Sequence, residues 1–243
     1  MCDRISSIYF VTFYQMGSIF SSNCVLCGSS TREKISLCLA CQDDLPRIEG
    51  ACTKCGIPVV SNESMCGKCL QEPPIVDYTF SMYHYESPVD SLITQLKFKQ
   101  QLSSAAILGV LMEKLLRKDL VINGCPDVIL PVPLHKGRLS QRGFNQSLEI
   151  SKPISDGLNI PIDYLLARRI KSTKSQMDLR ANERKRNIKG CFQVRLMPAY
   201  QHVVLVDDVV TTGSTTNELA KALKKSGVEK VGVWAVARAR IRE

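Results

Sequence analysis

The stretch "HVVLVDDVVTTGSTT" (His202–Thr216) places two adjacent carboxylates at the end of an apolar run. Its first residues are mostly β-branched and show little alternation, which is typical of a strand buried on both faces of a parallel sheet. The residues that follow, "STTNELAKALKKSG" (Ser214–Gly227), have helical spacing and end at a glycine. A buried strand, a tight loop and a helix in this order predict one unit of a parallel α/β sheet.

The loop between this strand and helix has the composition of a phosphate site. Ligands of open parallel sheets bind beyond the carboxyl ends of the strands, and a helix N-terminus suits an anion. Gly213 permits a turn that other residues disfavour. Asp207 and Asp208 would repel a phosphate, so we expect them to hold vicinal hydroxyls or Mg²⁺. A ribose 5-phosphate meets both requirements, with its diol at the acids and its phosphate in the loop.

Two well-known classes of site also place acidic residues at a strand end, and this chain fits neither. A Walker B strand ends in Asp, but the G-x-x-x-x-G-K-[ST] loop that must accompany it is absent from the chain. A receiver domain carries its acidic pair near its start, whereas this pair lies near the end of the chain. A purely structural helix cap would account for Ser214 or Thr215 but not for the paired acids.

The chain before this stretch also alternates between strand and helix patterns. Residues 70–88 are expected to form a linker and a short hairpin, with aromatic residues in near alternation. The helix expected after Pro88 has Leu92, Ile93, Leu96 and Phe98 as its apolar stripe. A second helix is expected at 105–120 and a third at 142–158. The other strands are expected at 127–133, 159–170, 191–194 and 230–239.

Eight of the eleven cysteines form four C-x-x-C pairs that recur every 14 residues, as if one unit had been duplicated. A C-x-x-C turn brings two thiolates to one ion, and Gly28 and Gly56 permit the turn. Four thiolates make a closed structural zinc site, which suits a module with little core of its own. The simplest pairing is sequential, with one zinc on Cys24, Cys27, Cys38 and Cys41, and another on Cys52, Cys55, Cys66 and Cys69. A crossed pairing stays open.

Zinc is favoured over disulfides because disulfides need an oxidising compartment, and the start of the chain does not read as a signal peptide. Because neither disulfides nor a signal peptide are expected, we expect a cytoplasmic protein. An iron–sulfur cluster is disfavoured because the spacing differs from ferredoxin patterns. The remaining Cys2, Cys125 and Cys191 receive no role. The Met-Cys start does not indicate an N-terminal nucleophile amidotransferase, since too few residues precede the cysteine module.

Composition supports a globular protein of 243 residues, with 44% hydrophobic and 23% charged residues and no apolar run of membrane-spanning length. The net charge of +9 is concentrated between Arg168 and Arg195, where ten basic residues face two acidic ones. Such a segment attracts phosphates, although it can also be a solvated charged face. The expected division is an extension or misassigned start at 1–21, a cysteine-rich double zinc module at 22–71 and an α/β domain at 72–243.

The stretch Val203–Thr215 resembles the type I phosphoribosyltransferase signature without a gap. The resemblance implies 5-phosphoribosyl-1-diphosphate (PRPP) as ligand, with Mg²⁺. It assigns Asp207 and Asp208 to the ribose hydroxyls and Mg²⁺. The 5-phosphate would lie on Thr211, Thr212, Gly213, Ser214 and Thr215.

Two further segments, "LPVPLHKGRLSQRGFNQSLEIS" (130–151) and "TKSQMDLRANERKRNIKGCF" (173–192), resemble the ComF family of competence-related and GntX-like proteins. The resemblance covers 23–240 and implies a Rossmann-like parallel sheet of the type I phosphoribosyltransferase kind behind a small zinc-ribbon module. It implies a mobile loop at 165–189. It also implies a diphosphate loop at 133–142, with Pro133, Leu134, His135, Arg138 and Arg142 as candidate residues.

Three functions follow from the resemblance. The first is assistance to the uptake of transforming single-stranded DNA, with DNA-uptake machinery as partner. The second is phosphoribosyl transfer to an unidentified acceptor of nucleotide metabolism or salvage. The third is a PRPP sensor without turnover. No catalytic residue is assigned.

Overall fold

The computed structural model describes residues 22–59, 64–172, 188–195 and 200–240. The chain divides into two compact units, Met1–Leu45 and Pro46–Glu243. The division separates the two cysteine tetrads, because the first lies within the smaller unit and the second lies within the larger one.

The described part of the smaller unit is a single ribbon. Strands β1 (Ser22–Asn23) and β2 (Ser30–Thr31) pair antiparallel, and the short helix α1 (Leu39–Asp43) follows. Its buried apolar side chains are few, with Leu37 and Leu45 the most enclosed. A unit with so little core depends on a bound metal for its stability.

The larger unit is built on a parallel sheet with the strand order β3-β8-β7-β4. Its strands are β3 (Tyr78–His84), β4 (Val128–Pro131), β7 (His202–Val210) and β8 (Lys230–Arg238). β7 and β8 occupy the centre, where Val203–Val206 are fully buried. The apolar run before the paired acids is therefore a core strand, as predicted.

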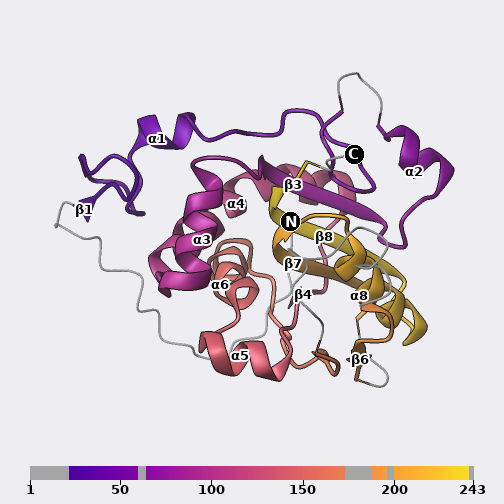
Figure 1. Ribbon diagram of the computed structural model, residues 1–243. Helices are drawn as coiled ribbons and strands as arrows, with labels where there is room; N and C mark the ends of the chain where they lie inside the picture. Colours follow the sequence, from indigo (N-terminus) through magenta and orange to yellow (C-terminus); the bar gives the residue numbers. More distant parts are fainter. Residues whose placement is uncertain (1–21, 60–63, 173–187, 196–199, 241–243) are drawn as a thin grey trace. The chain divides into compact units, whose positions relative to one another are not determined.

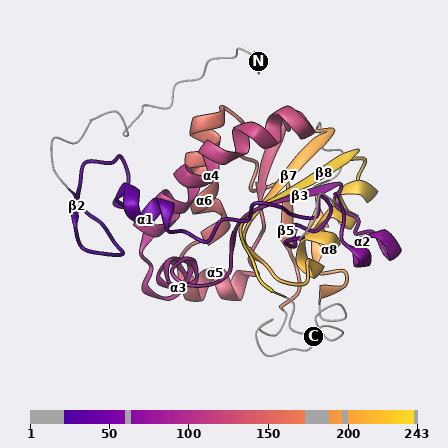
Figure 2. The same ribbon diagram turned by 90° about the horizontal axis from the view of Figure 1, so that it is seen from above.

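Helices cover both faces of this sheet (Figures 1 and 2). One face carries α3 (Val89–Lys99), α4 (Leu102–Asn123) and α6 (Gln146–Leu158), and the other carries α8 (Ser214–Lys225). The indole of Trp234 in β8 donates a 2.8 Å hydrogen bond to Asp119 of α4, which satisfies both polar groups inside the core.

Smaller elements complete the larger unit. They are α2 (Gly67–Gln71), α5 (Lys136–Arg142), and the strands β5 (Ala167–Arg169) and β6 (Phe192–Val194), which pair antiparallel in a sheet of their own. No helix within the described residues is long and apolar enough to cross a membrane.

The predicted fold class is confirmed, and three local predictions are wrong. Residues 78–84 form one edge strand that pairs with β8, and not a hairpin, because the strand's partner comes from the end of the chain. Residues 159–170 do not form one continuous strand. They contribute a single parallel bridge from Ile162 to Ile129 of β4, and the three-residue strand β5 outside the main sheet. Phe98 is 69% exposed and does not belong to the buried stripe of its helix.

Two predictions fall largely outside the described residues. These are the extension at 1–21 and most of the mobile loop at 165–189, with the central members of the basic segment.

Candidate functional site

The paired acids lie near the end of β7 and differ in their surroundings. Asp207 is partly exposed and lines a pocket, whereas Asp208 is 4% exposed. The strand itself continues two residues past the acids, to Val210.

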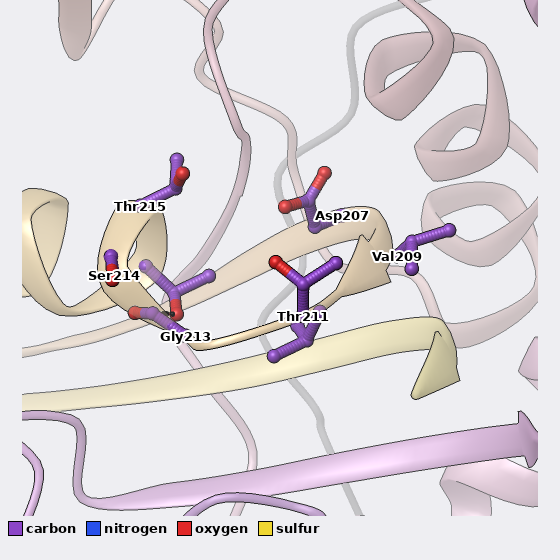
Figure 3. Close-up of a pocket in the computed structure, with 8 residues that line it drawn as sticks. Asp207, Val209, Thr211, Gly213, Ser214 and Thr215 are labelled. Carbon is purple, nitrogen blue, oxygen red and sulfur yellow. Dashed lines mark hydrogen bonds between the residues drawn. The ribbon is translucent and has the colours of Figure 1, made fainter. Parts of the chain in front are cut away.

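The loop after β7 and the first turn of α8 form the rest of this pocket. Figure 3 shows Asp207 and Thr215 projecting on the same side of the loop. Gly213 caps the helix with φ 74°, a conformation that the glycine permits. The other lining residues within the described part of the chain are Val209, Val210, Thr211, Ser214 and Thr216.

Hydroxyl groups organise the loop. The hydroxyls of Thr212 and Ser214 lie 2.7 Å apart, and Thr216 donates to the Gly213 carbonyl at 3.0 Å. The first amides of a helix have no partner within the helix and lie at the positive end of its dipole. A loop with this composition at a helix N-terminus can bind an anion such as a phosphate.

Asp208 is paired with a cation from another element. Nζ of Lys97, in the last turn of α3, lies 2.6 Å from its Oδ2. Burial opposes the charged form of Lys97, but Asp208 and Asp207 raise the pKa of Lys97 above its usual value. Lys97 thus remains a cation and neutralises one charge of the acidic pair.

Asp207 keeps its proton more tightly than an ordinary aspartate. Burial is the main cause, the neighbouring charge of Asp208 adds to it, and together they raise the pKa of Asp207 to about 8. Its Oδ1 accepts hydrogen bonds from the Asp208 amide at 3.0 Å and from the Ser147 hydroxyl at 3.4 Å. A ligand that supplies hydrogen-bond donors or positive charge would stabilise the ionised form of this carboxyl group.

Ser147 belongs to the first turn of α6, whose start is tied to the end of β4. Asn145 caps α6 by accepting from the Ser147 amide at 3.0 Å, and it donates to the Val132 carbonyl at 3.1 Å. Asn145 and Ser147, at the start of α6, therefore join the carboxyl ends of the neighbouring strands β4 and β7.

The predicted diphosphate loop contains a short helix. Pro133 is buried after β4, and His135 caps α5 by accepting from the Gly137 amide at 3.2 Å. Arg142 donates to Gln146 at 2.6 Å, and its guanidinium lies 6.0 Å from the exposed Phe98 ring. Burial lowers the pKa of Arg142 while the nearby Asp208 opposes that shift, which places this arginine in the electrostatic field of the acids. The remaining candidates of this loop are the partly exposed Leu134 and Arg138.

Four cysteine sulfurs come together in each half of the ribbon module. The tetrads are Cys24, Cys27, Cys38, Cys41 and Cys52, Cys55, Cys66, Cys69, and the sulfurs of each lie within 4.8 Å of one another. The sequential pairing is therefore the one adopted. Sulfur atoms around a tetrahedral zinc stand about 3.8 Å apart, given bonds of about 2.3 Å. Cys27–Cys38 and Cys55–Cys66 are each separated by 3.7 Å, so both tetrads fit zinc.

The two halves repeat the same local backbone. The first C-x-x-C turn of each tetrad, Cys24–Cys27 or Cys52–Cys55, is called its knuckle. In each knuckle the carbonyl of the first cysteine accepts from a glycine amide at 2.8 Å, with Gly28 at φ 77° and Gly56 at φ 68°. The third cysteine caps a five-residue helix in both halves. Burial opposes the thiolates of Cys24 and Cys52, yet backbone amides lower their pKa values to about 6 and about 7. Burial raises the pKa values of Cys41, Cys55 and Cys69. The backbone therefore favours the thiolate, the form that binds zinc, at the first cysteine of each tetrad and not at every ligand.

Sequence reasoning missed Lys97, Ser147 and Arg238, which contact the acids or the loop. Arg238 is 2% exposed and donates to the carbonyls of Val210 and Thr211, where the loop begins. The sequence shows Lys97 and Arg238 as charged residues within apolar segments. This pattern indicates that each needs a partner but does not identify the residue that each one contacts.

Two family models agree with this architecture. A family model described as "Double zinc ribbon domain" matches residues 16–70, and one described as "Phosphoribosyl transferase domain" matches residues 95–243. A solved purine phosphoribosyltransferase from Pyrococcus horikoshii aligns with 55% of this chain and 82% of its own, with 18% identity and a TM-score of 0.33.

Curated relatives extend over most of the chain. "Competence protein F" of Haemophilus influenzae is 36% identical over 92% of this chain and 100% of its own length. "DNA utilization protein YhgH" of Salmonella typhimurium is 36% identical over 88% of this chain and 89% of its own. "Competence protein ComFC" of Bacillus subtilis is 24% identical over 87% of this chain and 92% of its own. This chain therefore belongs to the ComF family, in which a double zinc ribbon precedes a phosphoribosyltransferase domain.

Proposed function

We propose that this protein binds PRPP with Mg²⁺ in the pocket at the end of β7. The observation that carries the proposal is that one pocket is lined both by a carboxylate, Asp207, and by the hydroxyl-rich turn that starts α8. A carboxylate accepts hydrogen bonds from sugar hydroxyls, whereas the turn suits a phosphate. Each charge-assisted hydrogen bond would contribute roughly 1.5–3 kcal/mol.

Within this proposal the residues have separate tasks. The family signature assigns both acids to the ribose hydroxyls and Mg²⁺. Asp207 lines the described pocket and would contact them directly, whereas Asp208 is buried and paired with Lys97. Thr211–Thr215 are assigned to the 5-phosphate. Arg142 and Arg138, with the segment Pro133–His135, are assigned to the diphosphate. The position of Arg142 in the field of Asp208 supports its assignment. Bound Mg²⁺ would supply charge neutralisation for the diphosphate.

The biological role we propose is assistance to the uptake of transforming single-stranded DNA into the cytoplasm. Support comes from the names of the curated relatives, which refer to competence and to DNA utilization. The basic segment supports it as well, because a run of cations binds a phosphate backbone. Its described and exposed members are Arg168, Lys171, Lys189 and Arg195, whereas Arg169 is buried.

The alternatives are phosphoribosyl transfer to an acceptor and PRPP sensing without turnover. In transfer, the bond between ribose C1 and the diphosphate breaks, a nucleophile binds C1, and pyrophosphate leaves. Catalysis would come from positioning and from neutralising the leaving group. Incubation with PRPP and an acceptor panel distinguishes the two, because only transfer releases pyrophosphate.

Titration calorimetry with Mg²⁺ and PRPP tests the binding proposal. The wild type should bind, and Asp207→Asn combined with Asp208→Asn should abolish binding. The matched control is Asp156→Asn, which removes one exposed carboxylate from α6. Equal affinity in the wild type and the double variant would refute the assignment.

DNA binding is tested separately by fluorescence anisotropy with a labelled single strand. The proposal expects an affinity that falls steeply with salt, because phosphate contacts release counterions. The absence of binding at low salt, with zinc in place, would count against the proposed role in DNA uptake.

A further inference from the structure

The second cysteine tetrad is built into the phosphoribosyltransferase fold. Its knuckle packs against β3, where the Thr79 amide donates to the Thr53 carbonyl and the Thr79 hydroxyl donates to the Lys54 carbonyl, both at 2.8 Å. Gly56 closes this contact, since a Cβ at that position would lie 2.4 Å from the Ser81 hydroxyl. The knuckle and the sheet therefore form one packed body.

Arg238, at the end of β8, connects this knuckle with the loop of the candidate site. Its Nε donates to the carbonyl of the zinc ligand Cys55 at 2.9 Å. Its Nη1 donates to the carbonyl of Val210 at 3.0 Å and to that of Thr211. One buried guanidinium thus bridges a zinc knuckle and the first residues of the loop.

A second connection runs through α8. The side-chain oxygen of Asn217, in the first turn of α8, accepts from the Ile75 backbone amide at 2.8 Å. The backbone amide of Asn217 donates to the Gly213 carbonyl at 2.9 Å. Ile75 follows the helix α2 that carries Cys69. The loop is therefore held at its start by Arg238, which contacts the second ribbon, and at its end by Asn217, which contacts the segment that follows the ribbon.

We propose that Arg238 is a positioning residue that couples zinc at the second tetrad to ligand binding in the Thr211–Thr215 loop. Zinc fixes the Cys52–Cys55 turn, the turn orients Arg238, and Arg238 fixes the carbonyls of Val210 and Thr211. Because coupling between two sites is reciprocal, a ligand in the loop also tightens zinc at the second tetrad. The ligand arm of this inference rests on the proposed binding of PRPP, whereas the coupling of zinc to the loop does not.

The repeated ribbon supplies a matched control. Cys66→Ser with Cys69→Ser removes the second zinc site, and Cys38→Ser with Cys41→Ser removes the equivalent ligands of the first, which belongs to the unit ending at Leu45. Hydrogen–deuterium exchange of a peptide spanning residues 210–217 reports on the loop in the absence of ligand. We expect faster exchange only when the second site is lost. Equal exchange in the two double variants would overturn the coupling.

Arg238→Lys tests the bridge while both tetrads remain intact. Arg238 uses two separate nitrogen atoms, Nε for Cys55 and Nη1 for the loop carbonyls, whereas a lysine offers its donors from one nitrogen. We therefore expect about tenfold weaker PRPP binding with two zinc ions retained. Unchanged affinity and unchanged loop exchange would overturn the role of Arg238.

A third measurement leaves both Arg238 and the second tetrad intact. In the Cys38→Ser, Cys41→Ser variant, which holds one zinc, PRPP should raise the zinc affinity of the second site about tenfold in a competition with a colorimetric chelator. If PRPP binds and zinc affinity stays the same, the coupling fails. If the wild type shows no PRPP binding, the proposed function fails, and loop exchange alone decides the coupling of zinc to the loop.

Discussion

Nζ of Lys97 lies 2.6 Å from Oδ2 of Asp208, and this ion pair connects the last turn of α3 to the end of β7. The two side chains are 21% and 6% exposed, so the pair is largely removed from water. Two adjacent carboxylates at a buried strand end would repel each other, and Lys97 offsets one of the two charges.

Lys97→Met should destabilise the protein by about 3 kcal/mol, because it leaves Asp208 buried without a counter-ion. Urea denaturation followed by circular dichroism measures the loss. Lys99→Met, an exposed neighbour in the same helix, is the control and should change stability little. Adding Asp208→Asn to Lys97→Met should recover part of the loss, because the uncompensated charge is then gone. A double variant no more stable than Lys97→Met would contradict the neutralising role of Lys97.

Asp207 should make stability depend on pH. Its pKa is raised to about 8 in the folded protein, whereas an unfolded aspartate titrates near about 3.9. Between these values the folded state binds the extra proton, so the free energy of unfolding contributed by Asp207 falls as pH rises from about 4 to 8. Asp207→Asn removes this penalty. The variant should gain stability over the wild type at pH 8, and the gain should shrink toward pH 5, as measured by urea denaturation. A gain of equal size at both pH values would show that Asp207 is not the titrating group.

Gly213→Ala should cost about 1–2 kcal/mol, because an alanine at φ 74° pays the left-handed penalty in a position with no close steric neighbour. The change should also weaken PRPP binding, since the same residue shapes the loop. Gly50→Ala, at a glycine without positive φ and outside the segments assigned to PRPP, is the matched glycine control. Thermal unfolding and calorimetry measure the two effects. Equal behaviour of the two alanine variants would contradict a special role for the Gly213 backbone.

The purified protein should contain two zinc ions per chain, and each double cysteine variant should lose one of them. Elemental analysis gives the count. Loss of the second site should lower the melting temperature of the larger unit, because its knuckle packs on β3. Loss of the first should leave that transition in place, since its ligands belong to the other compact unit. A single shared transition that both variants lower equally would contradict the division into units.

The strand–loop–helix unit around Asp207 and the pairing of the eight cysteines could be predicted from the sequence because their signals are local. A buried parallel strand shows its apolar residues consecutively, and a helix shows its period within a few turns. C-x-x-C pairs at a regular spacing indicate a metal site without knowledge of the rest of the chain. The family resemblance also rests on local motifs, because each of its segments is a short continuous stretch of sequence.

Only the tertiary structure decided which distant residues meet at the site. The strand β3 pairs with β8, Lys97 meets Asp208, and Arg238 meets Cys55, each across a long stretch of chain. Such contacts follow from strand order and register, which a single sequence does not encode in any local pattern. The sequence alone therefore determined the chemistry of the loop and of the thiolates. The tertiary structure determined that Lys97 neutralises Asp208, because a buried charge is costly without a partner and the partner comes from whichever element packs beside it. It also determined that the second ribbon packs on the phosphoribosyltransferase fold.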